Sequence, residues 1–139
     1  MAVKVKPTPA GKEWLYVGHY TDIEGNLILK IGTTADLRKR QREHTCAYKR
    51  RTKNHPMAAD GKFEYDWILP LSPANTLRFE VLNRESIKRQ GVGQFVKNDR
   101  FNCGKVQSVK VQVKIRKTYE VFLIMEQEVK NGKGMDLLE

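Results

Sequence analysis

Two β-prone runs separated by a short turn most constrain how this chain can fold. Residues 14–20 are rich in aromatic side chains, and residues 27–31 form a second strand-like run. A turn signal centred on Gly25 lies between them. The pattern predicts an antiparallel hairpin in which Lys30 lies opposite Tyr20. Because side chains alternate between the two faces of a strand, three polar residues are expected to share one face. These are Tyr16, Tyr20 and Lys30.

The rest of the chain reads as further helices and strands. Helical patterns cover residues 35–50, 73–90 and 117–130, and alternating patterns cover residues 63–69 and 106–115. The third strand should present one large aromatic face. Its members are Phe63, Tyr65, Trp67 and Leu69. We therefore predict an α+β fold: a three-stranded antiparallel sheet flanked by helices, with a C-terminal strand and helix appended.

The expected domain organisation is simple. Residues 1–12 hold prolines, a glycine and lysines and read as a basic N-terminal arm. Residues 13–104 form the core, in which 51–62 is a loop and 95–103 is irregular. Residues 105–139 form the C-terminal strand–helix extension of the same domain. No internal repeat is present.

The first helix carries unusual residues on the face that should meet the sheet. Thr33 or Thr34 can cap it, and Asp36 suits the positive end of its dipole. The residues at helical spacing on one face are Leu37, Arg40, Gln41, His44, Ala47 and Tyr48. An arginine and a histidine thus occupy positions where apolar core residues are expected.

Charge points to a polyanionic partner. The 139 residues carry a formal net charge of +10, with a pI near 9.7, which favours nucleic acid over an anionic membrane surface. The longest apolar run, 121–125, is too short for a membrane helix. The first residues have no apolar stretch behind their charges, so we expect no secretory signal. Two cysteines cannot form a disulfide framework and suggest reduced thiols in the cytoplasm.

The sequence that follows the hairpin resembles a nuclease signature. Residues 30–32 (Lys-Ile-Gly), then 33–40, then His44 four residues after Arg40, resemble the second half of the signature of the GIY-YIG nuclease family. Either 18–20 or 14–16 stands where that family has its first motif. Lys30 replaces the tyrosine of the second motif.

This resemblance implies metal-dependent hydrolysis of phosphodiester bonds in DNA. Tyr16 or Tyr20, together with Lys30, would activate the attacking water, since a phenolate or a neutral amine can take its proton. Arg40 would stabilise the charge on the phosphorus, and His44 would assist. If the protein is phage-encoded, its cytoplasm is that of the bacterial host cell.

Other residues would hold the metal and the substrate. A glutamate of the second helix would bind Mg²⁺ or Mn²⁺; we favour Glu80 over the alternative Glu85. Asn98 is the candidate for a supporting asparagine, and Asn102 is the alternative. The basic residues expected along the DNA backbone are Arg38, Lys39, Arg42, Lys49, Arg50 and Arg51.

Three other interpretations compete with the nuclease. The main rival is a catalytically inactive nucleic-acid-binding module, and a basic scaffold protein without nucleic-acid chemistry is the weaker one. A zinc site is disfavoured because its cysteines and histidines match no standard spacing. Its ligands would be His44, Cys46, His55 and Cys103. A monomer and a homodimer are both compatible with the sequence.

Overall fold

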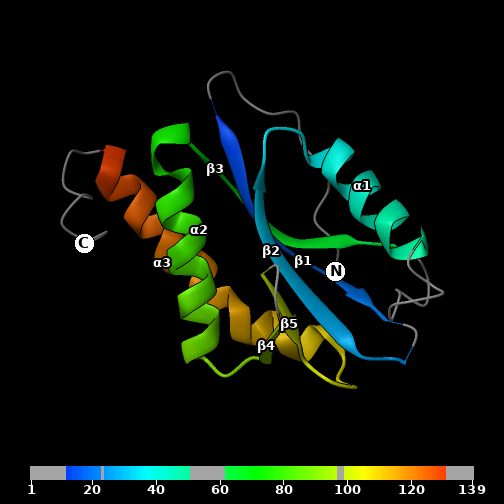
Figure 1. Cartoon of the computed structure of the whole chain (residues 1–139). Coiled ribbons are helices and arrows are strands. Elements are labelled where there is room, and N and C mark those ends of the chain that lie inside the picture. Colours follow the sequence, from blue (N-terminus) through cyan, green and yellow to red (C-terminus); the bar gives the residue numbers. More distant parts are fainter. Residues whose placement is uncertain (1–11, 23, 51–61, 97–98, 131–139) are drawn as a thin grey trace.

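The computed structural model describes residues 12–22, 24–50, 62–96 and 99–130. Within these residues, five strands form one sheet in the order β3-β1-β2-β5-β4, and three helices pack against it. The strands are β1 (Glu13–Thr21), β2 (Leu27–Thr34), β3 (Glu64–Leu71), β4 (Gln94–Val96) and β5 (Arg100–Asn102). The helices are α1 (Leu37–Arg50), α2 (Pro73–Arg89) and α3 (Ser108–Lys130). Figure 1 shows α1 on one face of the sheet and both α2 and α3 on the other.

The prediction of an α+β fold with a three-stranded sheet is wrong in the size of the sheet. The described strands number five, and every neighbouring pair is antiparallel. The two additional strands, β4 and β5, lie in residues 95–103 and just before, where the sequence suggested irregular structure. Each has three residues, which is too short for an alternating pattern to stand out.

The expected C-terminal strand over residues 106–115 is also wrong, because this segment begins α3. Val109 and Val113 are 60% and 67% exposed, whereas Val111 and Ile115 are buried. The buried positions continue at helical spacing to Phe122. The alternation of β-branched residues therefore resembles the pattern of a strand, although these residues lie in a helix of 23 residues.

The first hairpin is closed by the side chain of Asp22, which is buried. Its Oδ1 accepts hydrogen bonds from the backbone N–H groups of Glu24, at 3.0 Å, and Asn26, at 2.8 Å. Gly25 lies between them with φ of +87°, a conformation that glycine adopts without strain. The turn sequence and the aspartate before it thus fix where the two strands begin to pair.

This turn sets a pairing that differs from the expected one by two residues. Gly18, not Tyr20, lies opposite Lys30, and Tyr20 lies opposite Ile28. A shift of two residues leaves every side chain on its original face. The sharing of one face by Tyr16, Tyr20 and Lys30 therefore follows from the observed pairing as well.

A β-bulge between β1 and β3 divides the predicted aromatic face. Val17 pairs with Trp67, but the next residue, Gly18, pairs with Tyr65, so Asp66 is the extra residue. As a result Tyr65 lies on the α1 face and Trp67 on the opposite face. The prediction that the aromatic residues of this strand share one face is wrong for this reason.

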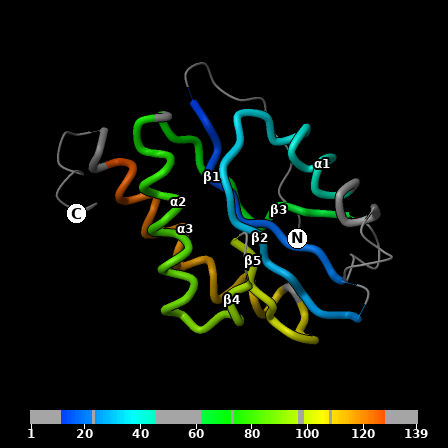
Figure 2. The backbone as a smooth tube through the Cα atoms, viewed as in Figure 1, coloured from blue at the N-terminus to red at the C-terminus, as the bar shows by residue number. Residues whose placement is uncertain are grey.

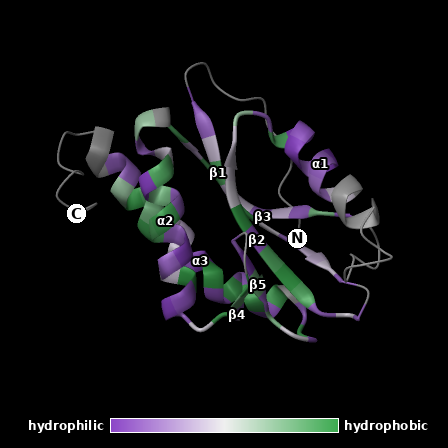
Figure 3. Ribbon diagram, in the orientation of Figure 1, coloured by the Kyte–Doolittle hydropathy of each residue, from purple (hydrophilic) through white to green (hydrophobic). Residues whose placement is uncertain are grey.

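The sheet separates two apolar clusters. The larger one lies between the sheet and the α2–α3 pair, whose helices run side by side (Figure 2). The smaller one lies under α1 and is rich in aromatic rings. Figure 3 shows that the coloured part of α1 is mostly hydrophilic, and this part of the helix contributes Leu37 to the cluster. In the described part of the chain, no helix has the length and apolar character needed to cross a membrane.

The start of α1 depends on a short network of side-chain caps. Asp36 Oδ1 accepts a hydrogen bond from the backbone N–H of Lys39 at 3.0 Å, so Asp36 caps the helix. Thr34 Oγ1 accepts from the backbone N–H of Asp36 at 3.0 Å and thus supports the cap, a role different from the one expected. On the sheet side, Gln41 Nε2 donates to the carbonyl of Phe63 at 2.9 Å. These bonds fix which side of α1 faces the sheet.

Candidate active site

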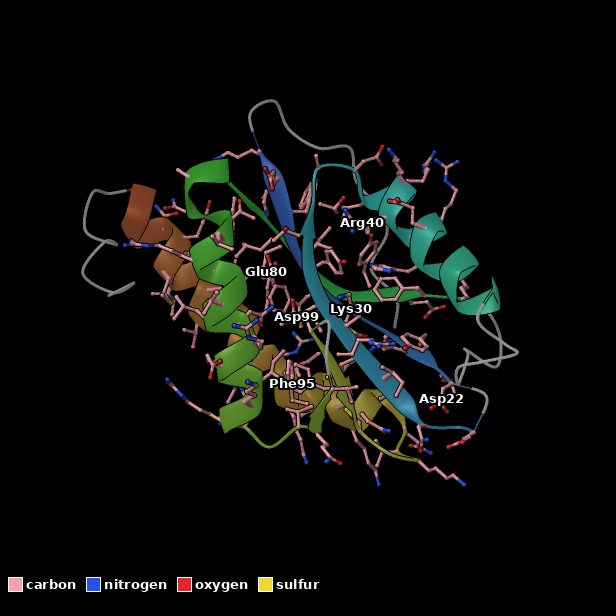
Figure 4. The ribbon with its side chains drawn as sticks, viewed as in Figure 1. Asp22, Lys30, Arg40, Glu80, Phe95 and Asp99 are labelled. Carbon is pink, nitrogen blue, oxygen red and sulfur yellow. The ribbon has the colours of Figure 1, made fainter. Side chains whose placement is uncertain are left out.

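The candidate site lies where β2 continues beyond the end of its pairing with β5. The two strands pair only as far as Lys30 with Arg100. The next contact comes from Asp99, whose carbonyl accepts a hydrogen bond from the backbone N–H of Ile31 at 3.0 Å. Figure 4 shows the side chains of Arg40, Lys30, Glu80 and Asp99 gathered along this part of β2. They come from α1, β2, α2 and the segment before β5, so elements from both faces of the sheet meet at one edge.

The position of the Tyr16 side chain depends on the absence of a side chain at the glycine opposite it. Tyr16 and Gly32 are cross-strand partners, and a Cβ atom on Gly32 would lie only 2.6 Å from Tyr16 Oη. The phenol therefore occupies the space that the glycine leaves. Burial raises the pKa of the Tyr16 phenol, and the nearby Arg40 guanidinium offsets part of the rise. Tyr16 is consequently neutral at physiological pH.

His44 is the hydrogen-bond partner of Tyr16. The distance between Tyr16 Oη and His44 Nε2 is 2.9 Å. Burial, with the charges of Lys30 and Arg40, lowers the pKa of His44 to about 3. The imidazole is therefore neutral near pH 7, and we assign the shared proton to the Tyr16 hydroxyl, which donates to Nε2. The Tyr16 oxygen keeps its lone pairs for another group.

Arg40 extends from the inner side of α1. Its side chain is 41% exposed, and its Nε lies 3.7 Å from Glu43 Oε1, which is too long for a hydrogen bond. Nε is buried and has no hydrogen-bond partner among the described residues. A buried donor of this kind is costly unless a ligand satisfies it. Arg40 is thus prepared to donate to an anion.

Lys30 carries a half-buried amine that has both acidic and basic side chains as neighbours. Burial lowers the pKa of its ammonium group. Asp99 and Glu80 oppose this effect, whereas Arg100 and Arg40 add to it. The result is an amine that releases its proton more readily than an exposed lysine does.

Glu80 and Asp99 form a pair of carboxyl groups beside Lys30. Burial raises the pKa of Glu80, and the charge of Asp99 and a hydrogen bond between the two carboxyls raise it further. Arg84 Nη1 donates to Asp99 Oδ1 at 3.1 Å. The alternative metal ligand, Glu85, instead lies 3.7 Å from the side-chain nitrogens of both Arg84 and Lys88. Of the two glutamates, Glu80 is the one placed beside Lys30.

Sequence reasoning did not identify Asp99. Its φ of +57° makes it the only described non-glycine residue with a left-handed backbone, a conformation that often stores strain at functional sites. The available signal was its position directly after Asn98, a residue already singled out. Asn98 itself lies outside the described residues. Asn102 Oδ1 accepts a hydrogen bond from the backbone N–H of Gly104 at 2.9 Å and so stabilises the turn after β5.

The remaining predicted residues lie around the site or outside the described part. Tyr20 is buried on the same sheet face as Tyr16, and its hydroxyl accepts a hydrogen bond from Arg100 Nη1 at 3.3 Å. The exposed basic residues on α1 are Arg38, Lys39 and Arg42. Nothing is described for the side chains of Lys49 and Arg50, and Arg51 lies outside the described residues.

The described residues contain no group of three or more His, Cys, Asp and Glu side chains arranged for a metal ion. Of the four residues considered for zinc, His44 bonds to Tyr16, and Cys103 packs against the α2–α3 cluster. His55 lies outside the described residues, as does the side chain of Cys46. The Glu80–Asp99 pair offers two carboxylates, a donor set that suits a hard cation which keeps several waters.

Comparison with known proteins corrects the family that the sequence suggested. A family model, the T5orf172 domain, matches residues 13–131. This domain is distinct from GIY-YIG, so the inferred membership of the GIY-YIG family is wrong. Searches of curated proteins and of solved structures find no match. T5orf172 is a phage-type domain. Because its model covers most of the chain, including every element described above, this protein belongs to the T5orf172 domain family.

Proposed function

We propose that this protein is a metal-dependent endonuclease that hydrolyses phosphodiester bonds in DNA. One arrangement supports the proposal: an amine with a lowered pKa, a guanidinium and a pair of carboxyl groups lie along the same part of β2 (Figure 4). Phosphodiester hydrolysis requires a group to accept the proton of water, a cation for the charge on phosphorus and stabilisation of the leaving oxygen. The chain places residues suited to each role within one small region.

Lys30 is the proposed proton acceptor. Its neutral amine would take a proton from the attacking water as the new oxygen–phosphorus bond forms, and the bond to the leaving oxygen then breaks. Tyr16 would orient this water, because its own proton is directed to His44 and its oxygen can accept a hydrogen bond. The leaving oxygen would take its proton from solvent.

Arg40 would stabilise the negative charge that develops on the phosphoryl oxygens. Its planar guanidinium can donate two parallel hydrogen bonds to a phosphate. The unsatisfied Nε shows that the donor is not already committed to another side chain of the described residues. His44 would support Arg40 indirectly, since a neutral imidazole adds no competing charge.

Glu80 and Asp99 would hold a divalent cation, Mg²⁺ or Mn²⁺. The two carboxyls are close enough to share a hydrogen bond, and one or two carboxylates with waters and phosphate oxygens are the usual protein donors to Mg²⁺. Such a cation supplies Lewis acidity to the leaving oxygen when it is bound. The exposed basic residues of α1 would bind the DNA backbone.

The test is cleavage of supercoiled plasmid with Mg²⁺, with Mn²⁺ and with EDTA. We expect relaxation that depends on the metal and that falls at least about a hundredfold in Arg40→Ala and Glu80→Gln, as for lost electrostatic stabilisation in other enzymes. Glu85→Gln is the matched control for Glu80, because it removes a carboxylate from another part of the same helix. Arg116→Ala is the control for Arg40, because Arg116 is exposed on α3, across the sheet.

Two outcomes would contradict this proposal. If wild-type protein cleaves no plasmid, single-stranded DNA or RNA but binds DNA with salt sensitivity, the chain is an inactive nucleic-acid-binding module. If Glu80→Gln keeps full activity while Glu85→Gln loses it, the metal is held elsewhere on α2.

A further inference from the structure

We propose that Arg100, positioned by Tyr20, binds the DNA backbone phosphate adjacent to the one that is cut. This inference rests on the proposed function and gives Arg100 a role that the preceding mechanism does not use. It also gives Tyr20 a positioning role in place of a catalytic one. The supporting observations are the pairing of β2 with β5 and one side-chain hydrogen bond.

The first observation is that two basic residues face each other across the sheet. Lys30 and Arg100 are direct cross-strand partners, so their side chains leave the sheet on the same face only about 5 Å apart at Cβ. Like charges in this relation destabilise a sheet. The structure retains the pair on a half-buried face. A bound phosphodiester would add a negative charge beside this pair of cations.

Of the two residues, Arg100 is the permanent cation. A guanidinium keeps its proton at all physiological pH values, and its charge is one of the causes that lower the pKa of Lys30. Arg100 is therefore the member of the pair that can bind an anion at every physiological pH.

Tyr20 gives the Arg100 guanidinium a fixed orientation. Tyr20 is 3% exposed, and its hydroxyl accepts a hydrogen bond from Arg100 Nη1 at 3.3 Å. A guanidinium held in this way loses less conformational entropy when it binds a phosphate. The buried phenol thus acts through Arg100 and not on the reacting atoms.

The position of Arg100 relative to Arg40 indicates which phosphate it binds. Arg100 lies directly opposite Lys30 on β5, whereas Arg40 reaches the same part of β2 from α1 (Figure 4). Arg40 is assigned to the reacting phosphate. A DNA strand carries one negative charge per nucleotide, so the second guanidinium is suited to the neighbouring phosphate.

The inference is tested by binding without cleavage. Fluorescence anisotropy of a labelled DNA duplex in EDTA, repeated over a range of salt concentrations, gives the affinity and its salt dependence. We expect Arg100→Gln to weaken binding roughly three- to tenfold and to reduce the salt slope by about one, as for one lost phosphate contact. Arg100→Lys should keep the slope because it keeps the charge. Arg116→Gln, which removes an exposed guanidinium on α3, should change neither value.

Tyr20→Phe separates positioning from charge. It should lower affinity less than Arg100→Gln does and leave the salt slope unchanged, since the guanidinium is still present but less ordered. In cleavage assays at a pH on the plateau of the pH–rate profile, both variants should raise KM and leave kcat within about threefold, because they affect a flanking phosphate.

The proposal is overturned if folded Arg100→Gln and Arg100→Lys proteins both bind with the wild-type affinity and salt slope. It is also overturned if Arg116→Gln reduces the slope as much as Arg100→Gln does, because the effect would then be one of overall charge. Failure of the proposed nuclease activity is a separate result: wild-type protein would then cleave nothing, while the binding measurements would still report on Arg100.

Discussion

The phenol of Tyr16 lies in the space that Gly32 leaves open across β1 and β2. A Cβ atom at position 32 would lie 2.6 Å from Tyr16 Oη and 2.9 Å from Tyr16 Cζ. The same placement brings Tyr16 Oη within 2.9 Å of His44 Nε2. Gly32 is therefore part of the candidate site although it carries no functional group.

Gly32→Ala should damage both the fold and the site. The new methyl group must displace the Tyr16 ring, which should reduce the free energy of unfolding by about 1–3 kcal/mol, as overpacking does elsewhere. The Tyr16–His44 hydrogen bond should break, so plasmid cleavage should fall at least about tenfold. Urea denaturation and cleavage kinetics measure the two effects.

Two further variants make this prediction specific. Thr33→Ala changes the adjacent residue, whose side chain leaves β2 on the opposite face, and should keep wild-type cleavage. In a double-mutant cycle, Tyr16→Phe should relieve part of the Gly32→Ala destabilisation, because the atom closest to the new methyl is removed. Wild-type stability and activity in Gly32→Ala would show that Tyr16 can occupy another position at no cost.

His44 should make the protein less stable in acid. Burial and the charges of Lys30 and Arg40 lower its pKa from 6.5 to about 3. Below pH 6.5 the unfolded chain takes up a proton that the folded chain does not, so the free energy of unfolding falls as the pH drops from about 6.5 towards 3. In His44→Gln this contribution is absent, and urea denaturation at pH 7 and pH 4.5 should show a smaller difference than in wild type.

His19 provides a control because its pKa is shifted in the direction opposite to that of His44. Burial lowers its pKa, but the hydrogen bond and charge of Asp66, 2.8 Å away, raise it overall above 6.5. Its contribution to stability is therefore present below pH 6.5 and is lost as the pH rises through the folded-state pKa. His19→Gln should make the loss of stability in acid steeper. A steeper loss in His44→Gln as well would mean that His44 is protonated in the folded protein.

Lys30 should set the acid limb of the pH–rate profile for cleavage. Burial, aided by Arg100 and Arg40, lowers its pKa below 10.5, so the rate should rise with pH and level off below that value. Lys30→Arg keeps a positive charge that does not titrate and should abolish cleavage while retaining DNA binding. Arg100→Gln removes a neighbouring cation, so its acid limb should shift to higher pH. A pH-independent rate in wild type would exclude Lys30 as the proton acceptor.

The elements with strong local signals were predictable from the sequence. The helix α2 was expected over residues 73–90 and spans Pro73–Arg89, because Ser72-Pro73 and Gly91 mark its ends. The first hairpin was expected for a similar reason. In contrast, β5 joins the sheet by pairing with β2, and β4 joins it by pairing with β5. No local pattern encodes the long-range pairing of β5 with β2.

The candidate site was predictable only in part. Alternation along the strands and helical spacing along α1 place Tyr16, Lys30, Arg40 and His44 on one side of the sheet. The same spacing follows from any strand that leads through a glycine into a helix, which is why it suggested the wrong family. Asp99 reaches the site through a left-handed backbone and through β5, and neither can be deduced from residue spacing.

The helical state of residues 108–115 can be tested by substituting two residues that a strand would place on the same face. Ile115 is 1% exposed and lies in the cluster under α2 and α3, whereas Val113 is 67% exposed. In a helix, Ile115→Ala should reduce the free energy of unfolding by about 2–4 kcal/mol, and Val113→Ala should change it by less than about 0.5 kcal/mol. Urea denaturation of the two variants measures both values. If the segment were a strand, both residues would face the core, and the two substitutions would destabilise the protein to similar degrees.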